Sequence, residues 1–480
     1  MRRAKIIATL GPATDDPRVL KKLIMGGADT IRLNYSHGTH EDQEKRVKQI
    51  YELTEKTGRH IGIMADLQGP KIRIASFKEG YVVLEEGDEF TLDSSLKQND
   101  GDEQQVGLTY KNLVNDVKKG DNLLLDDGRI ILQVERIRDT RIKCVVLLGG
   151  YLSNNKGLNK EGGGLSAKAL TAKDRRDLRH AIQIGVDFIA LSFPRDAADV
   201  ESLRRLIKKE GGECRIIAKI ERAEAVENET EIIEAADAIM IARGDLGVEI
   251  GDAALPPVQK RLIKKARRMN KVVITATQMM ESMIENHIPT RAEVFDVANA
   301  VLDGTDAVML SAETSIGKYP VEVVKSMSRI IFETEKQRGS LGADYRIEQK
   351  FEGIDETIAM ATMYAANHIK ARAIASLTES GSTCKWLSRT RSGIPIFAFS
   401  RSPKTCRRVT LFRGVYPFLY DITHTDFLEA NKEMIDILKK HNAVKDGDTV
   451  IITKGDLQGT TGGTNGMKIV RVGELVEHRS

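Results

Sequence analysis

The sequence predicts an α/β protein: a (β/α)8 (TIM) barrel with an inserted small all-β lid domain and a C-terminal open α/β domain. Three observations predict this architecture. Eight short apolar runs rich in β-branched residues recur between helix-period segments, their spacing breaks once, and a second alternating series follows a polar stretch. Eight parallel strands with helices between them are the number that closes such a barrel.

The predicted barrel strands are short and end in polar residues. They cover residues 5–10, 30–36, 61–67, 188–193, 216–221, 238–245, 272–278 and 307–313. Their ends carry side chains such as Arg32, Asp66, Lys219 and Glu313, which are too polar for buried strands. Because barrel enzymes place their chemistry at the C-terminal ends of the strands, we expect these side chains to ring one mouth.

More than 100 residues separate the third run from the fourth, where one helix and a loop would be enough. From about residue 69 to residue 170 the sequence consists of short β-rich runs separated by Gly and Asp, which is typical of hairpins. Glycines at 149–150 and 162–164 favour flexible connections. We therefore interpret this insertion as a lid that closes over the mouth.

A polar stretch at 339–353 is interpreted as a domain linker. Beyond it, helices are expected at 356–370, 385–391, 405–411 and 427–440, and strands at 373–377, 394–399, 449–453 and 467–472. The predicted domains are 1–69 with 171–340 for the catalytic barrel, 70–170 for the lid and 341–480 for a C-terminal α/β regulatory domain.

Composition excludes several function classes. Lys plus Arg (73) and Asp plus Glu (69) nearly cancel over 480 residues, so a net charge of +4 favours neither nucleic acid nor membrane as a partner. The four cysteines are far apart and form no CxxC pair, which predicts free thiols in a reducing compartment. With no signal-peptide pattern and no run of eighteen apolar residues, a cytoplasmic protein is expected.

Side chains two residues apart on a strand share a face, so three polar sets are each expected to point together: Arg32 with Asn34 and Ser36, Lys219 with Glu221, and Arg243 with Asp245. Any one set is explained equally well as a structural ion pair. Several sets at one mouth favour a charged ligand or a metal, because buried charge is costly without a partner.

The residue types indicate which ligand this is. Glu221 and Asp245 offer oxygen ligands to Mg²⁺ (or Mn²⁺) and leave positions open for substrate. Arg32, Arg73 and Lys219 supply the positive charge that phosphoryl transfer needs. No GxSxG elbow or Cys/His arrangement supports nucleophilic hydrolysis. The histidines after the second strand are not required by this chemistry, and His40 is interpreted as a surface or hydrogen-bonding residue.

Seven segments closely resemble motifs of the pyruvate kinase family. They are TLGP at 9–12, RLNYSHG at 32–38, DLQGPKIR at 66–73, AKIE at 218–221, ARGDLG at 242–247, TATQM at 275–279 and SAET at 311–314. The resemblance spans the whole chain, and motifs of this length in this order are specific. It implies transfer of a phosphoryl group from phosphoenolpyruvate to ADP, giving pyruvate and ATP in the last step of glycolysis.

The resemblance also implies roles for single residues. Arg32 grips the transferring phosphate, and Lys219 stabilises its charge. Glu221 and Asp245 hold Mg²⁺, while the amides of Gly244 and Asp245 with Thr277 bind the substrate carboxylate. The nucleotide lies near Asn34, Tyr35, Ser36, His37, Arg73 and Lys156, and Ser311 belongs to the relay that protonates the enolate. Without the family, Thr277 is interpreted as a barrel hydroxyl bonded internally.

One position departs from the family pattern. Asn34, Ser36 and Asp66, with Leu67, resemble the ligands of a monovalent cation. Potassium-dependent members carry glutamate at the position of Lys71 and usually threonine at that of Leu67. An ammonium group beside these residues could replace the ion, so K⁺ is a possible cofactor and we expect only a weak requirement for it.

In the C-terminal domain, Thr378, Ser380, Ser382 and Thr383 lie between a strand and a helix, where helix N-termini bind phosphate. The alternative is a plain N-cap with a glycine turn. Residues 454–466 form a second Gly- and Thr-rich candidate loop. Similar pyruvate kinases bind a sugar-phosphate or nucleotide effector at these two places, and the resemblance implies a homotetramer.

The arginines at 401–413 are interpreted as a solvated helix face or a subunit contact. Two alternative functions stay open on the sequence alone. One is another barrel enzyme acting on phosphoenolpyruvate or a 2-oxo acid, and the other is a non-catalytic regulator that binds sugar phosphates. Formation of pyruvate that depends on ADP would separate the family's reaction from the first alternative, and the presence of Lys219, Glu221 and Asp245 argues against the second.

Overall fold

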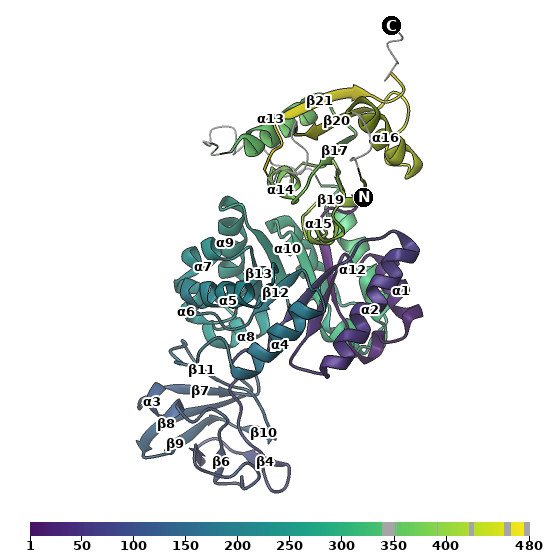
Figure 1. Cartoon of the computed structure of the whole chain (residues 1–480). Coiled ribbons are helices and arrows are strands. Elements are labelled where there is room, and N and C mark those ends of the chain that lie inside the picture. Colours follow the sequence, from purple (N-terminus) through teal and green to yellow (C-terminus); the bar gives the residue numbers. More distant parts are fainter. Residues whose placement is uncertain (338–350, 352, 391, 422–426, 456–461, 475–480) are drawn as a thin grey trace.

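The computed structural model describes residues 1–337, 351, 353–390, 392–421, 427–455 and 462–474. A barrel lies in the middle of the molecule, with the inserted β domain at one end and the C-terminal domain at the other (Figure 1). The predicted fold class is confirmed. The predicted linker at 339–353 lies outside the described residues except for 351 and 353.

Eight parallel strands close the barrel, and each lies within or overlaps one of the eight predicted runs. In order around the barrel they are β1 (Lys5–Thr9), β2 (Thr30–Asn34), β3 (Gly62–Asp66), β12 (Phe188–Leu191), β13 (Arg215–Ile220), β14 (Ala238–Ala242), β15 (Val272–Ala276) and β16 (Ala307–Leu310), which pairs with β1. Almost all of their residues are buried, because helices cover the outside and side chains fill the inside.

The helices around the barrel begin at defined caps. They are α1 (Pro17–Gly26), α2 (His40–Thr57), α4 (Ala172–Gln183), α5 (Ala197–Lys209), α6 (Ala223–Glu227), α7 (Glu229–Ala235), α8 (Arg243–Ile250), α9 (Leu255–Arg268), α10 (Arg291–Asp303), α11 (Ala312–Ser315) and α12 (Pro320–Thr334), with short 3-10 turns η1 (Pro12–Thr14) and η2 (Glu281–Ile284). Thr39, Thr171 and Thr290 form capping boxes that fix where α2, α4 and α10 start.

All eight predicted runs extend past the C-terminal ends of the observed strands by one to three residues, so Ser36 and Glu221 lie just beyond β2 and β13. In two cases a helix begins within the predicted run. β14 stops at Ala242 and α8 begins at Arg243, so Arg243 and Asp245 lie on a helix and the predicted shared strand face was wrong. The reason is a change of period: the continuous apolar run ends at Ala242, and the buried positions of α8 then follow helical spacing. Likewise, β16 stops at Leu310, and α11 carries Glu313.

The inserted domain has its own apolar core and two sheets. Its strands are β4 (Tyr81–Leu84), β5 (Glu89–Asp93), β6 (Gln105–Gly107), β7 (Asn122–Leu125), β8 (Ile130–Arg138), β9 (Arg141–Leu148), β10 (Gly150–Ser153) and β11 (Leu158–Lys160), with one short helix, α3 (Leu113–Asp116). β4 pairs with β10, and the other six form the sheet β11-β7-β8-β9-β5-β6.

The C-terminal domain is an open sheet in the order β19-β18-β17-β20-β21. Its elements are α13 (Ile354–His368), β17 (Ala373–Leu377), α14 (Ser382–Arg389), β18 (Ile396–Ser400), α15 (Pro403–Val409), β19 (Val415–Leu419), α16 (Phe427–Lys440), β20 (Thr449–Lys454) and β21 (Gly466–Arg471). Sequence reasoning missed β19. Pro417 argues against a strand, but it is tolerated because β19 is an edge strand.

The C-terminal domain docks on the end of the barrel where the strands begin. Arg389 binds Asp306 at 2.7 Å, Arg407 binds Asp187 at 3.1 Å, and Arg413 binds Glu335 at 3.2 Å. Leu411 joins the apolar cluster inside the barrel. The interpretation of the arginines at 401–413 as a solvated face or subunit contact was therefore wrong for Arg407 and Arg413, which neutralise barrel carboxylates of the same chain.

All four cysteines are free and buried. Within the ranges that the structure describes, no helix has both the length and the apolar character that crossing a bilayer requires.

Candidate active site

A chain of alternating charges crosses the barrel mouth. Asp66, at the end of β3, accepts a hydrogen bond from Arg32 Nε at 2.7 Å through Oδ2, and its Oδ1 lies 3.2 Å from Lys219 Nζ. Lys219 Nζ also lies 2.8 Å from Glu221 Oε1 and donates to Ser192 Oγ at 2.8 Å. The strands therefore bring together Arg32, Asp66, Lys219 and Glu221, as the sequence led us to expect.

Burial and charge shift the pKa values of these groups. Burial alone would raise the pKa of Asp66, but Lys219 and Arg32 outweigh it and hold that pKa below its usual value. Burial alone would lower the pKa of Lys219, but Asp66 and Glu221 raise it above its usual range. Lys219 is therefore a permanent cation at the mouth.

The pKa of Glu221 is raised instead. Burial is the main cause, Lys219 opposes it, and the nearby charge of Asp245 adds to it. Glu221 Oε2 accepts from the Phe193 amide at 2.9 Å, and Asp245 Oδ1 lies 3.3 Å from Lys71 Nζ. The charges of these two carboxylates thus act on each other, which is an environment that suits a divalent cation. Among the described residues, the mouth included, no group of three or more His, Cys, Asp or Glu side chains is placed to hold a metal ion, so the protein offers an ion two carboxylates here.

A cavity of about 600 Å³ opens at this mouth. Lys71, Gly244 and Asp245 line it together with Asp127 and Gly128 of the inserted domain. The cavity therefore lies between the barrel mouth and the lid, where water can be excluded when the two approach.

Thr277 has a strained backbone. Its φ is +66°, followed by +52° at Gln278, a region that β-branched residues rarely adopt. Its hydroxyl accepts from the Gly244 amide at 2.8 Å and donates to the Ala276 carbonyl at 2.6 Å. The internal bonding expected without the family is present, and the strained turn fixes the hydroxyl beside the first turn of α8.

Arg243 is not part of the charged chain. Its two terminal nitrogens each lie 2.7 Å from Asp296, and it donates to the carbonyls of Ala276, Thr277 and Gln278. Arg243 therefore stabilises the strained turn through hydrogen bonds to its carbonyl groups. Sequence reasoning missed this role because nothing near Arg243 in the chain points to Asp296.

Comparison with known proteins decides between the alternatives. The family model "Pyruvate kinase, barrel domain" matches residues 1–324, and "Pyruvate kinase, alpha/beta domain" matches residues 356–470. The chain belongs to the pyruvate kinase family. It is a phosphotransferase that moves a phosphoryl group from phosphoenolpyruvate to ADP, which excludes the two alternative functions.

Similarity to pyruvate kinases extends over nearly the full length of each relative. The chain is 51% identical to pyruvate kinase II of Salmonella typhimurium over 476 residues, covering 98% of this chain and 99% of that protein. It is 53% identical to the pyruvate kinase of Buchnera aphidicola subsp. Schizaphis graminum over 476 residues, with the same coverage. It is 49% identical to the Haemophilus influenzae enzyme over 465 residues, covering 96% and 97%.

The turn after β2 carries the residues expected near the nucleotide. Asn34 Oδ1 accepts from the Ser36 amide at 3.1 Å, and the side chains of Ser36 and His37 are exposed. The side chain of Tyr35 is buried, and its hydroxyl lies 2.9 Å from His180 Nδ1. The Tyr35 side chain is therefore engaged within the chain, and so are its amide and carbonyl, which bond to the Asp66 carbonyl and to Lys173.

Arg73 and Lys156 both lie in the inserted domain. Arg73 pairs with Gly157 in a β-bridge and donates to the Asn155 carbonyl at 2.9 Å, while Lys156 Nζ lies 2.7 Å from Asp126. Across the described ranges, no hydrogen bond or ion pair joins these two cations to the turn after β2. The structure thus brings the expected nucleotide residues into two groups, one on the barrel and one on the lid.

The remaining predicted residues are also at the mouth. Ser311 follows β16, and its amide donates to Glu313 Oε2 at 2.6 Å. Leu67 is buried, and its carbonyl accepts from Ser192 Oγ at 2.7 Å. The ammonium group of Lys71 contacts Asp245, so its ion pair is with an expected Mg²⁺ ligand and not with Asn34 or Asp66.

Proposed function

We propose that Arg32, Lys219, Glu221 and Asp245 perform the phosphoryl transfer of this pyruvate kinase. The proposal rests mainly on the position of Lys219: its Nζ lies 3.2 Å from Asp66 and 2.8 Å from Glu221 at the mouth. A fixed cation in a site of low dielectric stabilises the negative charge that develops on the transferring group, and it needs no reorganisation to do so.

Glu221 and Asp245 are the residues that would hold Mg²⁺. The raised pKa of Glu221, caused by burial and by Asp245, supports this assignment, because a divalent cation would compensate both carboxylates. The ion would supply Lewis-acid polarisation and charge neutralisation of the phosphate oxygens. The family generally uses Mg²⁺ and K⁺.

The substrate carboxylate is assigned to the amides of Gly244 and Asp245 and to Thr277. These amides begin α8, where backbone N–H groups have no helical partner. The Gly244 amide donates to Thr277 Oγ1 at 2.8 Å, so this group already presents converging polar atoms.

Ser311 is the assigned member of the relay that delivers a proton to the enolate. It stands at the end of β16, on the same rim as Lys219. Among the hydrogen bonds of the described residues, none uses its hydroxyl, whereas its amide is held by Glu313. The nucleotide is assigned to the turn of residues 34–37 on the barrel, where Asn34, Ser36 and His37 offer side chains and Tyr35 anchors the main chain, and to Arg73 and Lys156 on the lid.

The metal assignment is tested by titrating Mg²⁺ in Glu221→Gln at saturating substrates. We expect the Mg²⁺ concentration for half-maximal rate to rise by about tenfold or more, because one charged ligand is lost. Glu249→Gln is the matched control, since Glu249 is also a buried glutamate but accepts from the Ala223 amide and Asn159 instead. An unchanged Mg²⁺ requirement in Glu221→Gln would contradict the assignment.

The K⁺ requirement is proposed to be weak. Both oxygens of Asp66 already contact cations, Arg32 and Lys219, and Asn34 Oδ1 accepts from the Ser36 amide. Lys71 adds a positive charge at the same mouth, 3.3 Å from Asp245. Asp66, Asn34 and Lys71, three of the residues that matter for a monovalent cation, thus all form contacts within the chain.

The test is turnover in potassium-free tetramethylammonium buffer. We expect it to stay within about threefold of the value in K⁺, because protein cations supply the charge that the ion would add. Lys71→Glu should lose activity in the same buffer and regain it with K⁺. Parent enzyme that collapses without K⁺ and recovers with it would refute the proposal.

An allosteric effector is assigned to the loop at Thr378, Ser380, Ser382 and Thr383. The glycine turn of the plain N-cap alternative is present: Gly381 is the N-cap of α14, and the hydroxyls of Thr378 and Ser380 accept from the Gly381 and Ser382 amides at 3.0 and 3.4 Å. A cavity of about 240 Å³ beside the loop is lined by Ser380 and Ser382 and by three cationic side chains, Arg215, Lys385 and Arg408. Burial lowers the pKa of Lys385 to about 8. A phosphate would relieve that cost.

The second candidate loop at 454–466 lies partly outside the described residues, which omit 456–461. Activation assays with a panel of sugar phosphates and nucleotides test the site through Ser382→Ala with Thr383→Val. Activation that is unchanged for every compound would count against it.

A homotetramer is proposed from two separate exposed apolar surfaces. Phe295 and Ile316 are exposed on the barrel, and Ile354 and Tyr364 are exposed on the C-terminal domain. A tetramer with dihedral symmetry needs two different self-complementary interfaces, which two such surfaces could supply. Light scattering of the purified protein measures the assembly.

The predicted domain boundaries and a cytoplasmic location are kept as proposals. The inserted domain with its own core and the free thiols of all four cysteines support them. Limited proteolysis checks the boundaries, and fractionation of cells checks the location.

A further inference from the structure

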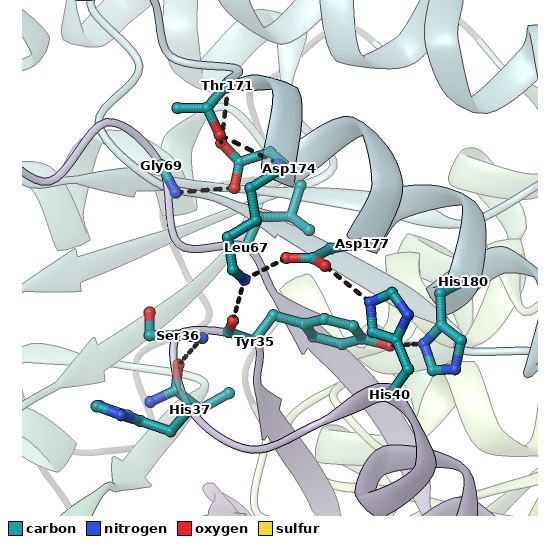
Figure 2. Close-up of polar contacts among 12 residues, drawn as sticks. Tyr35, Ser36, His37, His40, Leu67, Gly69, Thr171, Asp174, Asp177 and His180 are labelled. Carbon is teal, nitrogen blue, oxygen red and sulfur yellow. Dashed lines mark hydrogen bonds and ion pairs between the residues drawn. The ribbon is translucent and has the colours of Figure 1, made fainter.

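Figure 2 shows Tyr35, His40, Asp177 and His180, which belong to a network of polar and aromatic side chains that joins α4 to the turn after β2. Together with Lys173 they form what we call the α4 network. Lys173 Nζ donates to the Tyr35 carbonyl and to Asp177 Oδ2, both at 2.6 Å. Asp177 Oδ1 lies 2.8 Å from His40 Nε2. The hydrogen-bonding role expected for His40 is confirmed.

Stacked rings close the network on its other side. The imidazoles of His40 and His180 stack with centroids 4.0 Å apart and planes 5° from parallel. His180 Nδ1 lies 2.9 Å from the Tyr35 hydroxyl. Tyr35 is thus fixed at both ends, by Lys173 at its carbonyl and by His180 at its hydroxyl.

The network acts on a short main-chain segment. The Tyr35 amide donates to the Asp66 carbonyl at 3.0 Å, and the Tyr35 carbonyl accepts from Lys173. Gln43 adds weaker bonds of 3.3 Å to the carbonyls of Asn34 and His37. The backbone of residues 34–37 is therefore fastened, while the side chains of Ser36 and His37 stay exposed to a ligand.

The same helix also fastens the base of the inserted domain (Figure 2). Asp174 Oδ1 accepts from the Gly69 amide at 3.0 Å, and its Oδ2 accepts from the Thr171 amide at 2.8 Å. Gly69 lies where the chain leaves the barrel, and Thr171 lies where it returns. The first turn of α4 therefore holds both lid connections, and the α4 network holds the turn after β2.

Helix stability does not account for the network. An exposed Lys–Asp pair at i and i+4 contributes only about 0.3–0.5 kcal/mol to a helix. Here Asp177 is 4% exposed, and Lys173 reaches a carbonyl 138 residues away in the sequence. Ordering the Lys173 side chain across that contact costs conformational entropy. A contact with that cost indicates that the position of the Tyr35 main chain matters to the protein.

We propose that Lys173 and Asp177 are positioning residues for ADP: they fix the main chain of residues 34–37 and thereby set the affinity for the nucleotide. The proposal rests on the assignment of this segment to the nucleotide, made above. Because neither residue contacts Arg32, Lys219, Glu221 or Asp245 in the hydrogen bonds and ion pairs of the described residues, the chemical step itself does not depend on them.

The test uses purified full-length enzyme with rates measured against ADP at saturating phosphoenolpyruvate, and the reverse. Lys173→Met should raise KM for ADP about tenfold, with kcat and KM for phosphoenolpyruvate within about twofold, because a charged hydrogen bond is lost only at the nucleotide segment. Lys173→Arg should recover most of the loss. Arg176→Met on the exposed face of α4 should match the parent.

Asp177→Asn, which keeps the shape of the side chain, carries the same expectation and replaces Lys173→Met if that variant does not fold. An unchanged KM for ADP in both variants overturns the proposal, and so does a loss shared equally by kcat and both KM values. Ser36→Ala with His37→Ala separates the two assumptions. If this double variant raises KM for ADP while Lys173→Met does not, only the positioning role fails. If the double variant changes nothing, the nucleotide assignment itself fails.

Discussion

The two ends of the barrel both bury charged side chains, yet they balance them differently. At the base, Arg389 grips both oxygens of Asp306 at 2.8 and 2.7 Å, with side-chain exposures of 2% and 1%. At the mouth, Lys219 is shared between two carboxylates, Asp66 and Glu221, and a third, Asp245, lies close enough to raise the pKa of Glu221.

Buried charge by itself therefore does not identify an active site. At the base each carboxylate has a guanidinium partner, which leaves no capacity for a ligand. At the mouth the three carboxylates share Arg32, Lys219 and Lys71, and the Lys71–Asp245 pair stays partly exposed, so a ligand can still reach it. The position on the strands agrees, because the mouth lies at their C-terminal ends.

Lys219→Met removes the central cation of the mouth and should have the largest effect. We expect kcat to fall about a thousandfold, because a preorganised cation that stabilises the transferring phosphoryl group is lost. Steady-state rates with phosphoenolpyruvate, ADP and Mg²⁺ measure the effect. A variant that works as fast as the parent would remove the catalytic interpretation of the mouth.

Arg389→Met makes the reciprocal test at the base. It leaves Asp306 buried without its guanidinium, so the free energy of unfolding should drop by about 3–5 kcal/mol. Denaturant or thermal unfolding measures the loss, and kcat of the folded enzyme should be unchanged. Adding Asp306→Asn should recover part of the stability, since the uncompensated charge is removed. A large loss of kcat without a loss of stability would reverse the roles of the two ends.

A third buried charged group, Glu249, lies where the lid contacts the barrel, and its expected effect is smaller. Glu249 has no ion pair within the described residues, and burial raises its pKa from 4.5 to about 7. Because the folded pKa exceeds the unfolded pKa, its stabilising contribution is fully present below about pH 4.5 and is lost as the pH rises through about 7.

We therefore expect the parent to lose about 2 kcal/mol of stability between about pH 5 and pH 8 from this residue, and Glu249→Gln to lose less over the same range. Unfolding midpoints of the two proteins across that range measure the difference. Identical pH profiles would show that the seam does not bury a titrating carboxyl.

Much of this organisation follows from local sequence. The eight barrel runs were predicted because fully buried strands between helices produce continuous apolar segments, and the lid was predicted from its turn residues. Lys219 and Glu221 could be paired from the alternation of a strand. Each of these inferences uses neighbours in the chain.

The errors share a different physical cause. Arg243 was paired with Asp245 because the end of β14 could not be located, and its true partner, Asp296, lies 53 residues away. Arg407 and Arg413 were interpreted as solvated or intersubunit because their partners, Asp187 and Glu335, precede them by 220 and 78 residues. Long-range ion pairs leave no periodic signal, and β19 was hidden by Pro417.

Leu411 lies inside the barrel cluster, and three arginines of the same domain form ion pairs with carboxylates of the barrel. The C-terminal domain therefore closes the end of the barrel where the strands begin. Without that domain, the apolar and charged residues at this end of the barrel would be exposed to solvent. Cutting the chain after the barrel would leave Asp187, Asp306 and Glu335 without the arginines that neutralise them from the C-terminal domain. A smaller enzyme therefore cannot be made by removing the C-terminal domain alone.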